Sequence, residues 1–274
     1  MLAAPAIARA QFPQRLVTLD YGVAQTLIEI GRPPVAMAAT DEWAQWCVEP
    51  PLPAGVVNLG TSREPNLEIL QQLRPDLILT TPFLERLRPK LARVGPTESL
   101  VIHALDAPPW AAIVDATRAL GGRLGAVREA EALIARADAL VAEAAVRVAP
   151  LRDRPILLAA FQDARHVWVY GRNGIFDETL SRLGLVNGWT GRTNAWGFAS
   201  VGVEALASAS EARLACLDPT PADALALLDR SPIWRATGFA EPGRLLRLPA
   251  TLAFGMLPSA TRLARLLGEA ATRV

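Results

Sequence analysis

The sequence predicts an α/β protein built from two lobes that are joined by one long helix. Residues 128–148 read as a single uninterrupted helix. On each side of it, short apolar runs alternate with helical patterns, which is typical of sheets covered by helices. A chain of 274 residues, of which 51% are hydrophobic, is long and apolar enough to fill two modest cores.

The long helix is predicted by its periodicity. Apolar residues from Leu133 to Val148 recur on one helical face, and Glu143 precedes Arg147 by a favourable four-residue step. Neither Gly nor Pro interrupts the run, and Pro150 ends it. At 1.5 Å per residue the helix would be roughly 30 Å long, which is the width of a small domain.

The position of this helix divides the chain. We expect a rigid connecting helix over residues 126–149, between an N-terminal α/β lobe of residues 11–125 and a C-terminal α/β lobe of residues 150–274. The alternative is that it is only the longest helix of a single domain.

The first half of the chain alternates between strand and helix patterns. Pro33 and Pro34 end the first strand–helix unit, and Asn66 is a good N-cap for a later helix. This alternation predicts a largely parallel sheet covered by helices. Strands are expected at 15–20, 35–38, 76–80 and 99–105, an apolar stretch lies at 56–60, and helices are expected at 23–30, 67–73, 84–94 and 110–120.

The second half repeats this style and opens with two adjacent strands that the polar turn 162–165 separates, as in a hairpin. A loop rich in Gly and Trp follows at 187–197, and an amphipathic helix closes the chain. The expected strands are 155–161, 166–170, 214–217 and 245–248, and the expected helices are 175–183, 203–208, 222–228 and 258–270.

Composition excludes several classes of protein. The net charge of +1 is spread along the chain and gives no electrostatic footprint for nucleic acid. No apolar run approaches the ~20 residues of a membrane span. Cys47 and Cys216 fall in different predicted lobes, so we expect free, mostly buried thiols.

The first residues are rich in alanine. Ala8-Arg9-Ala10 has the small-x-small form of a signal-peptidase site. Because a charged n-region is missing, an export signal here would be truncated. The alternative is an ordinary Ala-rich terminus.

The sequence shows no catalytic motif: Walker A, G-x-S-x-G and H-E-x-x-H patterns are all missing. The glycines at 121–125 lie between predicted helices rather than after a strand, which argues against a dinucleotide loop. His103 and His166 are too few, without clustered Asp or Cys, for a zinc or manganese site. We therefore expect no catalytic residue, no metal site and no cofactor.

Large aromatic residues gather in the predicted loops. Trp43 and Trp46 precede a Pro-rich turn, Trp189 and Trp196 lie in the second-half loop, and Tyr21 follows the first strand. In open α/β sheets, loops at the strand ends line the ligand crevice. Trp offers a wide apolar face and one donor, which suits a bulky, partly polar ligand. The alternative is that each Trp packs within its own lobe.

Five segments resemble a known family. They are W-C-V-E-P-P-L-P at 46–53, E-P-N-L-E at 64–68, R-P-D-L-I-L at 74–79, Y-G-R-N-G-I-F at 170–176 and T-N-A-W-G at 193–197. With these, the chain resembles the periplasmic ferrichrome-binding proteins, which bind iron(III)-hydroxamate siderophores and have a helical backbone between two lobes. The resemblance runs from about Arg15 to near the C-terminus.

The resemblance implies a function. It predicts a monomeric periplasmic substrate-binding protein, not an enzyme, that delivers a ferric siderophore to the inner-membrane permease of an ABC importer. Iron would enter only as part of this ligand. Alternatives are a corrinoid or another bulky chelate on the same scaffold, a two-lobed α/β enzyme such as a glycosyltransferase, and a partner-binding scaffold without a small ligand.

The resemblance also implies binding residues, with departures from the family pattern. In the family, an Arg that binds the hydroxamate oxygens occupies the position of Ser62, and in this chain Arg63 lies one position later. The family's ligand-contacting Tyr falls at Phe83 or Leu84, and its last aromatic pair falls at Leu252 and Phe254. The ligand-binding set predicted in this way is Tyr21, Trp43, Trp46, Arg63, Phe83, Leu84, Asn194, Trp196 and Phe254.

Two acidic residues match the positions that contact the permease in the wider class. They are Glu68 and Glu204, each expected near a helix start on the crevice side of its lobe. The alternative is that both are ordinary surface acids.

Overall fold

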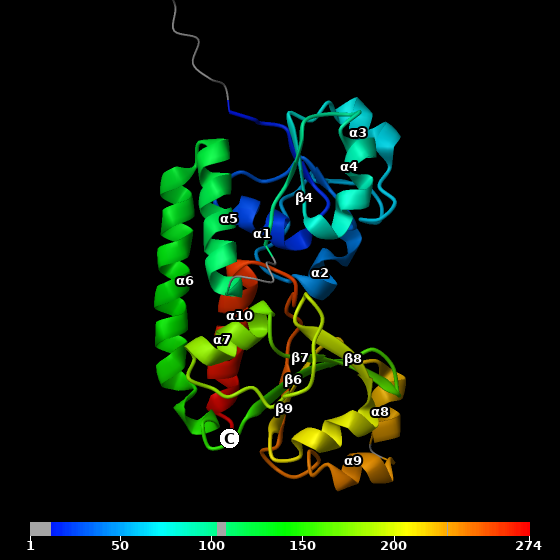
Figure 1. Ribbon diagram of the computed structural model, residues 1–274, viewed down its shortest axis with the longest axis vertical. Coiled ribbons are helices and arrows are strands. Elements are labelled where there is room, and N and C mark those ends of the chain that lie inside the picture. Colours follow the sequence, from blue (N-terminus) through cyan, green and yellow to red (C-terminus); the bar gives the residue numbers. More distant parts are fainter. Residues whose placement is uncertain (1–11, 103–107, 229) are drawn as a thin grey trace, which may run out of the picture.

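The computed structural model describes residues 12–102, 108–228 and 230–274 of the chain. An N-terminal lobe and a C-terminal lobe lie one above the other in Figure 1, and the long helix α6 runs beside both. Each lobe contains a five-stranded sheet. The predicted α/β class with two lobes is therefore confirmed. The Ala-rich N-terminus and His103 lie outside the described residues.

The N-terminal sheet is parallel throughout, in the order β3-β2-β1-β4-β5. Its central strands are buried along their whole length, as expected when helices cover both faces of a parallel sheet. The strands are β1 (Leu16–Thr18), β2 (Ala36–Met37), β3 (Val57–Asn58), β4 (Leu77–Thr80) and β5 (Thr97–Ser99). The helices are α1 (Tyr21–Glu29), α2 (Trp43–Trp46), α3 (Leu67–Leu73) and α4 (Arg88–Leu91), with 3-10 turns η1 (Thr40–Glu42) and η2 (Pro82–Leu87).

The C-terminal sheet is mixed, in the order β10-β9-β6-β7-β8. Strands β6 and β7 pair antiparallel, which confirms the predicted hairpin, and β8 adds a second antiparallel pair. The strands are β6 (Ile156–Phe161), β7 (His166–Tyr170), β8 (Phe198–Gly202), β9 (Arg213–Leu217) and β10 (Leu245–Leu248). The helices are α7 (Ile175–Arg182), α8 (Ala222–Leu228) and α9 (Pro232–Ala236), with 3-10 turns η3 (Ala149–Leu151) and η4 (Val203–Ala209).

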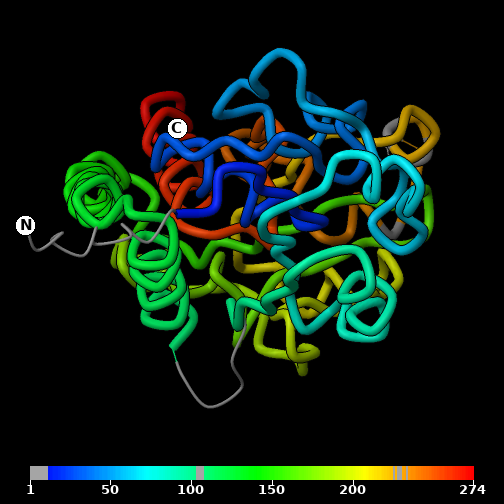
Figure 2. The backbone as a smooth tube through the Cα atoms, turned by 90° about the horizontal axis from the view of Figure 1, so that it is seen from above, coloured from blue at the N-terminus to red at the C-terminus, as the bar shows by residue number. Residues whose placement is uncertain are grey.

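Three long helices lie on one side of the molecule. They are α5 (Pro109–Leu124), α6 (Val127–Arg147) and α10 (Leu257–Ala271). Figure 2 shows α5 and α6 side by side at one edge of the molecule. Their backbones approach closely, because a Cβ added at Gly121 would lie 2.6 Å from the Cβ of Ala130. The connection between the lobes is thus a small bundle rather than α6 alone.

Several predicted elements need correction. The segment at 43–46 forms helix α2 instead of a loop, and the expected helix at 84–94 is divided into η2 and α4. The strand expected at 99–105 is β5, which ends at Ser99. Strand β8 and helix α9 were not predicted. Strand β8 has little apolar alternation and depends on its pairing with β7, which local sequence patterns do not report.

One hydrophobic core extends through both lobes. It contains Leu27 of α1, Leu79 of β4, Leu133 of α6, Leu158 of β6 and Leu263 of α10, all of them buried. Because burial of apolar surface is the main favourable contribution to folding, the two lobes are stabilised by the same cluster.

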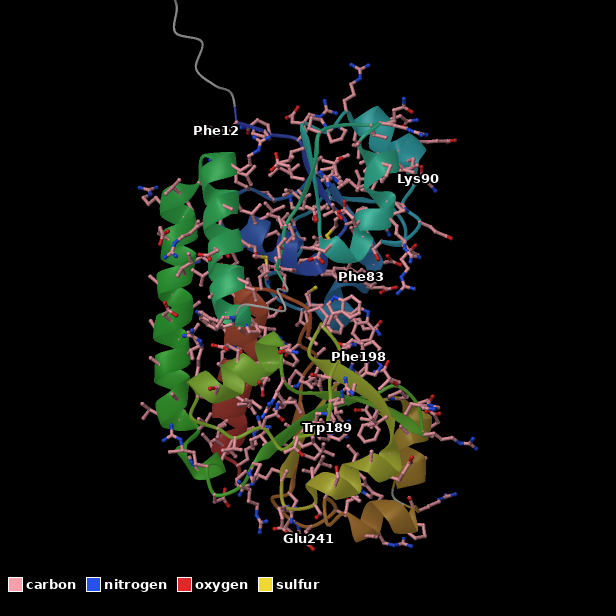
Figure 3. The ribbon with its side chains drawn as sticks, viewed as in Figure 1. Phe12, Phe83, Lys90, Trp189, Phe198 and Glu241 are labelled. Atoms are coloured by element: carbon pink, nitrogen blue, oxygen red, sulfur yellow. The ribbon has the colours of Figure 1, made fainter. Side chains whose placement is uncertain are left out.

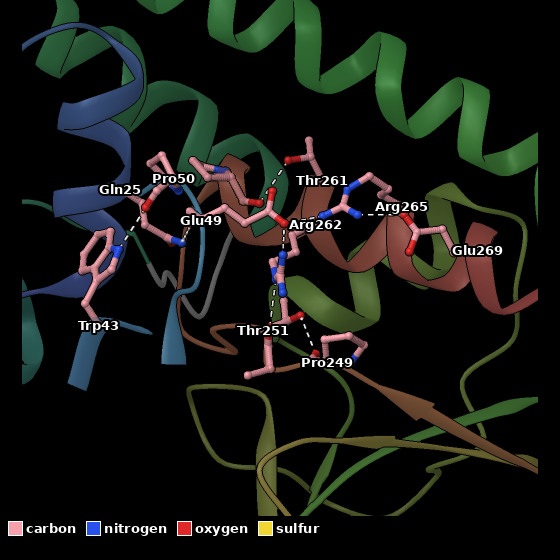
Figure 4. A network of polar contacts seen from close by, with 12 residues as sticks. Gln25, Trp43, Glu49, Pro50, Pro249, Thr251, Thr261, Arg262, Arg265 and Glu269 are labelled. Atoms are coloured by element: carbon pink, nitrogen blue, oxygen red, sulfur yellow. Dashed lines mark hydrogen bonds and ion pairs between the residues drawn. The ribbon is translucent and has the colours of Figure 1, made fainter. Parts of the chain in front are cut away.

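A polar cluster also fastens the N-terminal lobe to α10. The carboxylate of Glu49 pairs with Arg262 and Arg265, and its backbone carbonyl accepts a bond of 2.6 Å from Gln25 Nε2 (Figure 4). Ser259 Oγ donates to Gln25 Oε1 at 2.9 Å. The Arg262 side chain is only 7% exposed, so its charge depends on Glu49 for compensation.

We predict that Glu49→Ala lowers the free energy of unfolding by about 1–3 kcal/mol, because it leaves the buried guanidinium of Arg262 without its counter-charge. Urea unfolding at neutral pH measures the loss. The matched control is Glu143→Ala, which removes an exposed partner of Arg147 and should cost less than about 0.5 kcal/mol. Equally small losses in both variants would contradict the proposed role of Glu49.

Candidate functional site

A cavity of about 460 Å³ lies between the two lobes. Figure 3 places Phe83 on the N-terminal lobe and Phe198 on the C-terminal lobe where the lobes face each other. The N-terminal lobe contributes Leu19, Asp20, Tyr21, Gly22, Ala38, Ala39, Glu42, Thr61, Ser62, Arg63, Thr81, Phe83 and Leu84, and the rest of the wall is Trp168, Trp196, Phe198, Leu252 and Phe254.

Parallel strands explain why residues distant in sequence meet here. The segments after β1, β2, β3 and β4 leave the same edge of the N-terminal sheet, and each contributes to the cavity wall. A ligand crevice at the carboxyl ends of the strands is the general arrangement in open α/β sheets.

Aromatic side chains form the C-terminal wall of the cavity. The ring centroids of Trp168 and Phe198 lie 4.8 Å apart, and Phe254 lies 5.4 Å from Phe198 and 6.1 Å from Trp168. Trp168 and Phe198 are not among the residues predicted from the sequence to bind the ligand. The side chains of a strand alternate between its two faces. Val167 and Val169 are buried on one face of β7, so Trp168 points to the other face, and this alternation could have indicated that Trp168 lines the cavity.

Arg63, Phe83 and Trp196 stand together at the mouth of the cavity. The guanidinium carbon of Arg63 lies 5.4 Å from the centre of the Phe83 ring, and Phe83 meets Trp196 of the opposite lobe edge-on at 5.6 Å. Phe83 is 49% exposed and Trp196 36% exposed. These three side chains line the route by which a ligand would enter.

The loop that carries Arg63 is held by local bonds. Gly60 has a φ of +80°, which favours glycine, and it forms an isolated bridge with Pro65. Inside this loop the Glu64 N–H donates to Thr61 Oγ1 at 3.1 Å. Within the described residues, no carboxylate forms an ion pair with Arg63, so its charge is available to a ligand.

Two carboxylates also line the cavity. Asp20 caps α1, accepting from the Val23 N–H at 2.9 Å, and burial raises the pKa of its carboxyl. Glu42 Oε2 accepts from Trp46 Nε1 at 3.1 Å. The Tyr21 hydroxyl donates to the Ala39 carbonyl at 3.0 Å and lies 3.5 Å from Glu42 Oε2. Burial, reinforced by the Glu42 charge, raises the pKa of Tyr21, which therefore stays protonated at neutral pH.

The structure brings six of the nine predicted ligand-binding residues to the cavity wall. They are Tyr21, Arg63, Phe83, Leu84, Trp196 and Phe254.

The other three predicted residues do not line the cavity. Trp43 is 3% exposed, and its Nε1 donates to the Pro50 carbonyl at 2.9 Å. Trp46 is exposed beside Glu42, outside the wall itself. Asn194 shapes the loop instead, because its Oδ1 accepts from the Trp196 N–H at 2.9 Å.

Glu68 and Glu204 are both exposed and both lie in the first turn of a short helix, α3 and η4. Glu68 follows the Arg63 loop closely. Glu204 follows the end of β8 opposite to the cavity-lining Phe198.

No helix among the described residues is both long and apolar enough to cross a membrane. In the same part of the chain, no three His, Cys, Asp or Glu side chains are grouped as metal ligands would be. Cys47 and Cys216 are free and buried, as predicted.

Comparisons with known proteins agree on the family. The sequence profile described as "Periplasmic binding protein" matches residues 16–252. The iron(3+)-hydroxamate-binding protein FhuD of Escherichia coli is 30% identical over 258 residues, which are 94% of this chain and 87% of that protein.

Solved structures share the fold. The siderophore-binding protein FhuD of Vibrio cholerae, solved with Fe³⁺–Desferal, superposes with a TM-score of 0.85 at 23% identity, over 94% of this chain and 97% of that chain. A periplasmic heme-binding protein of Pseudomonas aeruginosa gives a TM-score of 0.74 at 25% identity, over 94% of this chain and 92% of that chain. With its two lobes, its cavity between them and these matches, the chain belongs to the periplasmic binding protein family.

Proposed function

We propose that this chain is the periplasmic substrate-binding protein of an ABC importer, and that it captures a ferric hydroxamate siderophore and delivers it to the permease. The observation that carries the proposal is the cavity between the lobes, with the guanidinium of Arg63 at its mouth and aromatic walls behind it. The similarity to the hydroxamate-binding protein of Escherichia coli supports it.

The chemistry of the ligand fits these walls. A ferric hydroxamate presents oxygens with partial negative charge around the metal, and an organic backbone encloses them. Arg63 offers planar donors to such oxygens, and the rings of Trp168, Phe198 and Phe254 offer apolar surface to the backbone. The volume of about 460 Å³ lies within the usual range of small-molecule sites. Iron would arrive and leave inside the ligand, so the protein needs no metal ligands of its own.

A second candidate ligand is a corrinoid or another bulky chelate. The broad aromatic wall favours it, since flat macrocycles stack well on such rings. A thermal-shift comparison of ferric hydroxamates with corrinoids and heme separates the candidates, because a ligand that binds only the folded state raises the melting temperature.

The first test concerns Arg63. Ferric hydroxamate should quench the tryptophan fluorescence of the protein, and Arg63→Ala should weaken binding by about 1.5–3 kcal/mol, as for a hydrogen bond to a charged group. The matched control is Arg93→Ala, which removes an exposed arginine that does not line the cavity. If both variants bind ferric hydroxamate as tightly as the parent protein, Arg63 does not form a hydrogen bond that contributes to ligand binding.

The second test concerns the permease. We propose that the protein docks as a monomer, with Glu68 and Glu204 pairing with basic residues of the membrane subunits. Changing both to Lys should abolish uptake of the siderophore in cells while its affinity for the purified protein is unchanged, because neither residue lines the cavity. The same change of charge at Asp115 and Glu211, which are 80% and 90% exposed, should preserve uptake. Undiminished uptake by the Glu68 and Glu204 variant would rule the docking assignment out.

The third test concerns motion between the lobes. We propose that the lobes move little on binding, because α6 contains neither Pro nor Gly and packs along α5 and α10. X-ray scattering curves with and without ferric hydroxamate should nearly superimpose. A large fall in the radius of gyration when the ligand is added would show that the connection bends.

A further inference from the structure

We propose that the cavity selects a ferric hydroxamate that carries a cationic amine, with Glu42 binding the ammonium group and Arg63 facing the hydroxamate oxygens. This inference rests on the proposed function and goes beyond it, because it specifies the charge of the ligand. It makes Glu42 a residue that determines specificity.

The cavity wall contains charged residues of both signs. Three of its residues carry a formal charge, namely Asp20, Glu42 and Arg63. None of the three forms an ion pair with another residue in the described part of the chain, so no N–O distance between Arg63 and either acid is within 4.0 Å. The wall therefore presents Glu42 and Arg63 as separated groups of opposite charge.

Glu42 is the carboxylate best placed for a ligand. Its Oε2 accepts from the neutral Trp46 indole, the Tyr21 hydroxyl lies 3.5 Å away with its shorter bond to the Ala39 carbonyl, and no cation among the described residues forms an ion pair with it. Asp20, by contrast, already caps α1 and accepts from Thr81 Oγ1 at 3.5 Å. Glu42 is exposed at the rim, where a ligand ammonium can reach it without full loss of hydration.

The surroundings of Glu42 also suit a cation. Tyr21, which lines the cavity, and Trp46 both contact its carboxylate, and aromatic faces attract alkylammonium groups through the ring quadrupole. The turn that carries Glu42 is fixed, because Asn58 Nδ2 of β3 donates to Asp41 Oδ1 at 2.8 Å. Glu42 is thus held in place before a ligand arrives.

The two charges match two ends of one ligand. Three hydroxamate anions cancel the charge of Fe³⁺, so the ferric core of a trihydroxamate is neutral and its oxygens face Arg63. Such a neutral ligand offers no cation to Glu42. A ligand with an additional protonated amine satisfies both residues, because Arg63 and Glu42 follow neighbouring strands, β3 and β2, without pairing with each other.

The test compares two ligands that differ in this one charge. Fe³⁺–Desferal carries a terminal primary amine, protonated at neutral pH, and its N-acetylated form keeps the same ferric core without the charge. Dissociation constants are measured for both by tryptophan quenching of the whole protein at low ionic strength. We expect the amine form to bind about fivefold more tightly, as for an exposed ion pair, and the advantage to shrink as salt is added.

Variants assign the effect to Glu42. Glu42→Gln should bring the ratio of the two dissociation constants to about one without changing the affinity for the acetylated form, since the amide oxygen still accepts from Trp46. Glu64→Gln is the control, because Glu64 is a nearby exposed acid outside the cavity wall, and it should keep the parent ratio.

These measurements distinguish a failure of this inference from a failure of the proposed function. Equal binding of both forms by the parent protein, or a ratio that survives in Glu42→Gln, overturns this inference and leaves the proposed function intact. If neither ferric complex binds, the proposed function itself fails, and the inference fails with it.

Discussion

The structure depends on one apolar cluster that both lobes share. Helices α6 and α10 pack against each other along one side of the molecule, and side chains from both sheets and from α1 join the same core. The Glu49–Arg262–Arg265 cluster reinforces this connection at the junction of the lobes. A turn of either lobe would disturb buried apolar contacts and a buried guanidinium charge, which is the reason for the proposal that the lobes move little on binding.

This constraint determines what the crevice can do. Phe83 of one lobe meets Trp196 of the other at the mouth of the cavity. The aromatic wall of the C-terminal lobe faces the polar loops of the N-terminal lobe across a volume that suits one small molecule. On the proposal that the lobes move little, binding costs little reorganisation of the backbone, and affinity depends on how well a ligand matches the walls and their charges.

The two lobes contribute walls of different polarity to the cavity. All three charged residues of the cavity belong to the N-terminal lobe, at the ends of its parallel strands, while the opposite wall is almost entirely apolar. A ligand with a polar end and an organic backbone is oriented by this difference. The long-range packing of α10 brings Phe254 to the apolar wall, although it lies more than 50 residues beyond Phe198 in the chain.

Local sequence determined the elements whose signals are local: the periodicity of α6, the Asn66 cap of α3 and the apolar run of β4. The positions of Arg63 and Tyr21 after strands also indicated the crevice. Only the tertiary structure decided that Trp43 is buried, that β8 forms, and that Trp168 and Glu42 face the ligand space. The physical reason is that burial and strand pairing depend on neighbours distant in the chain, which no local pattern records.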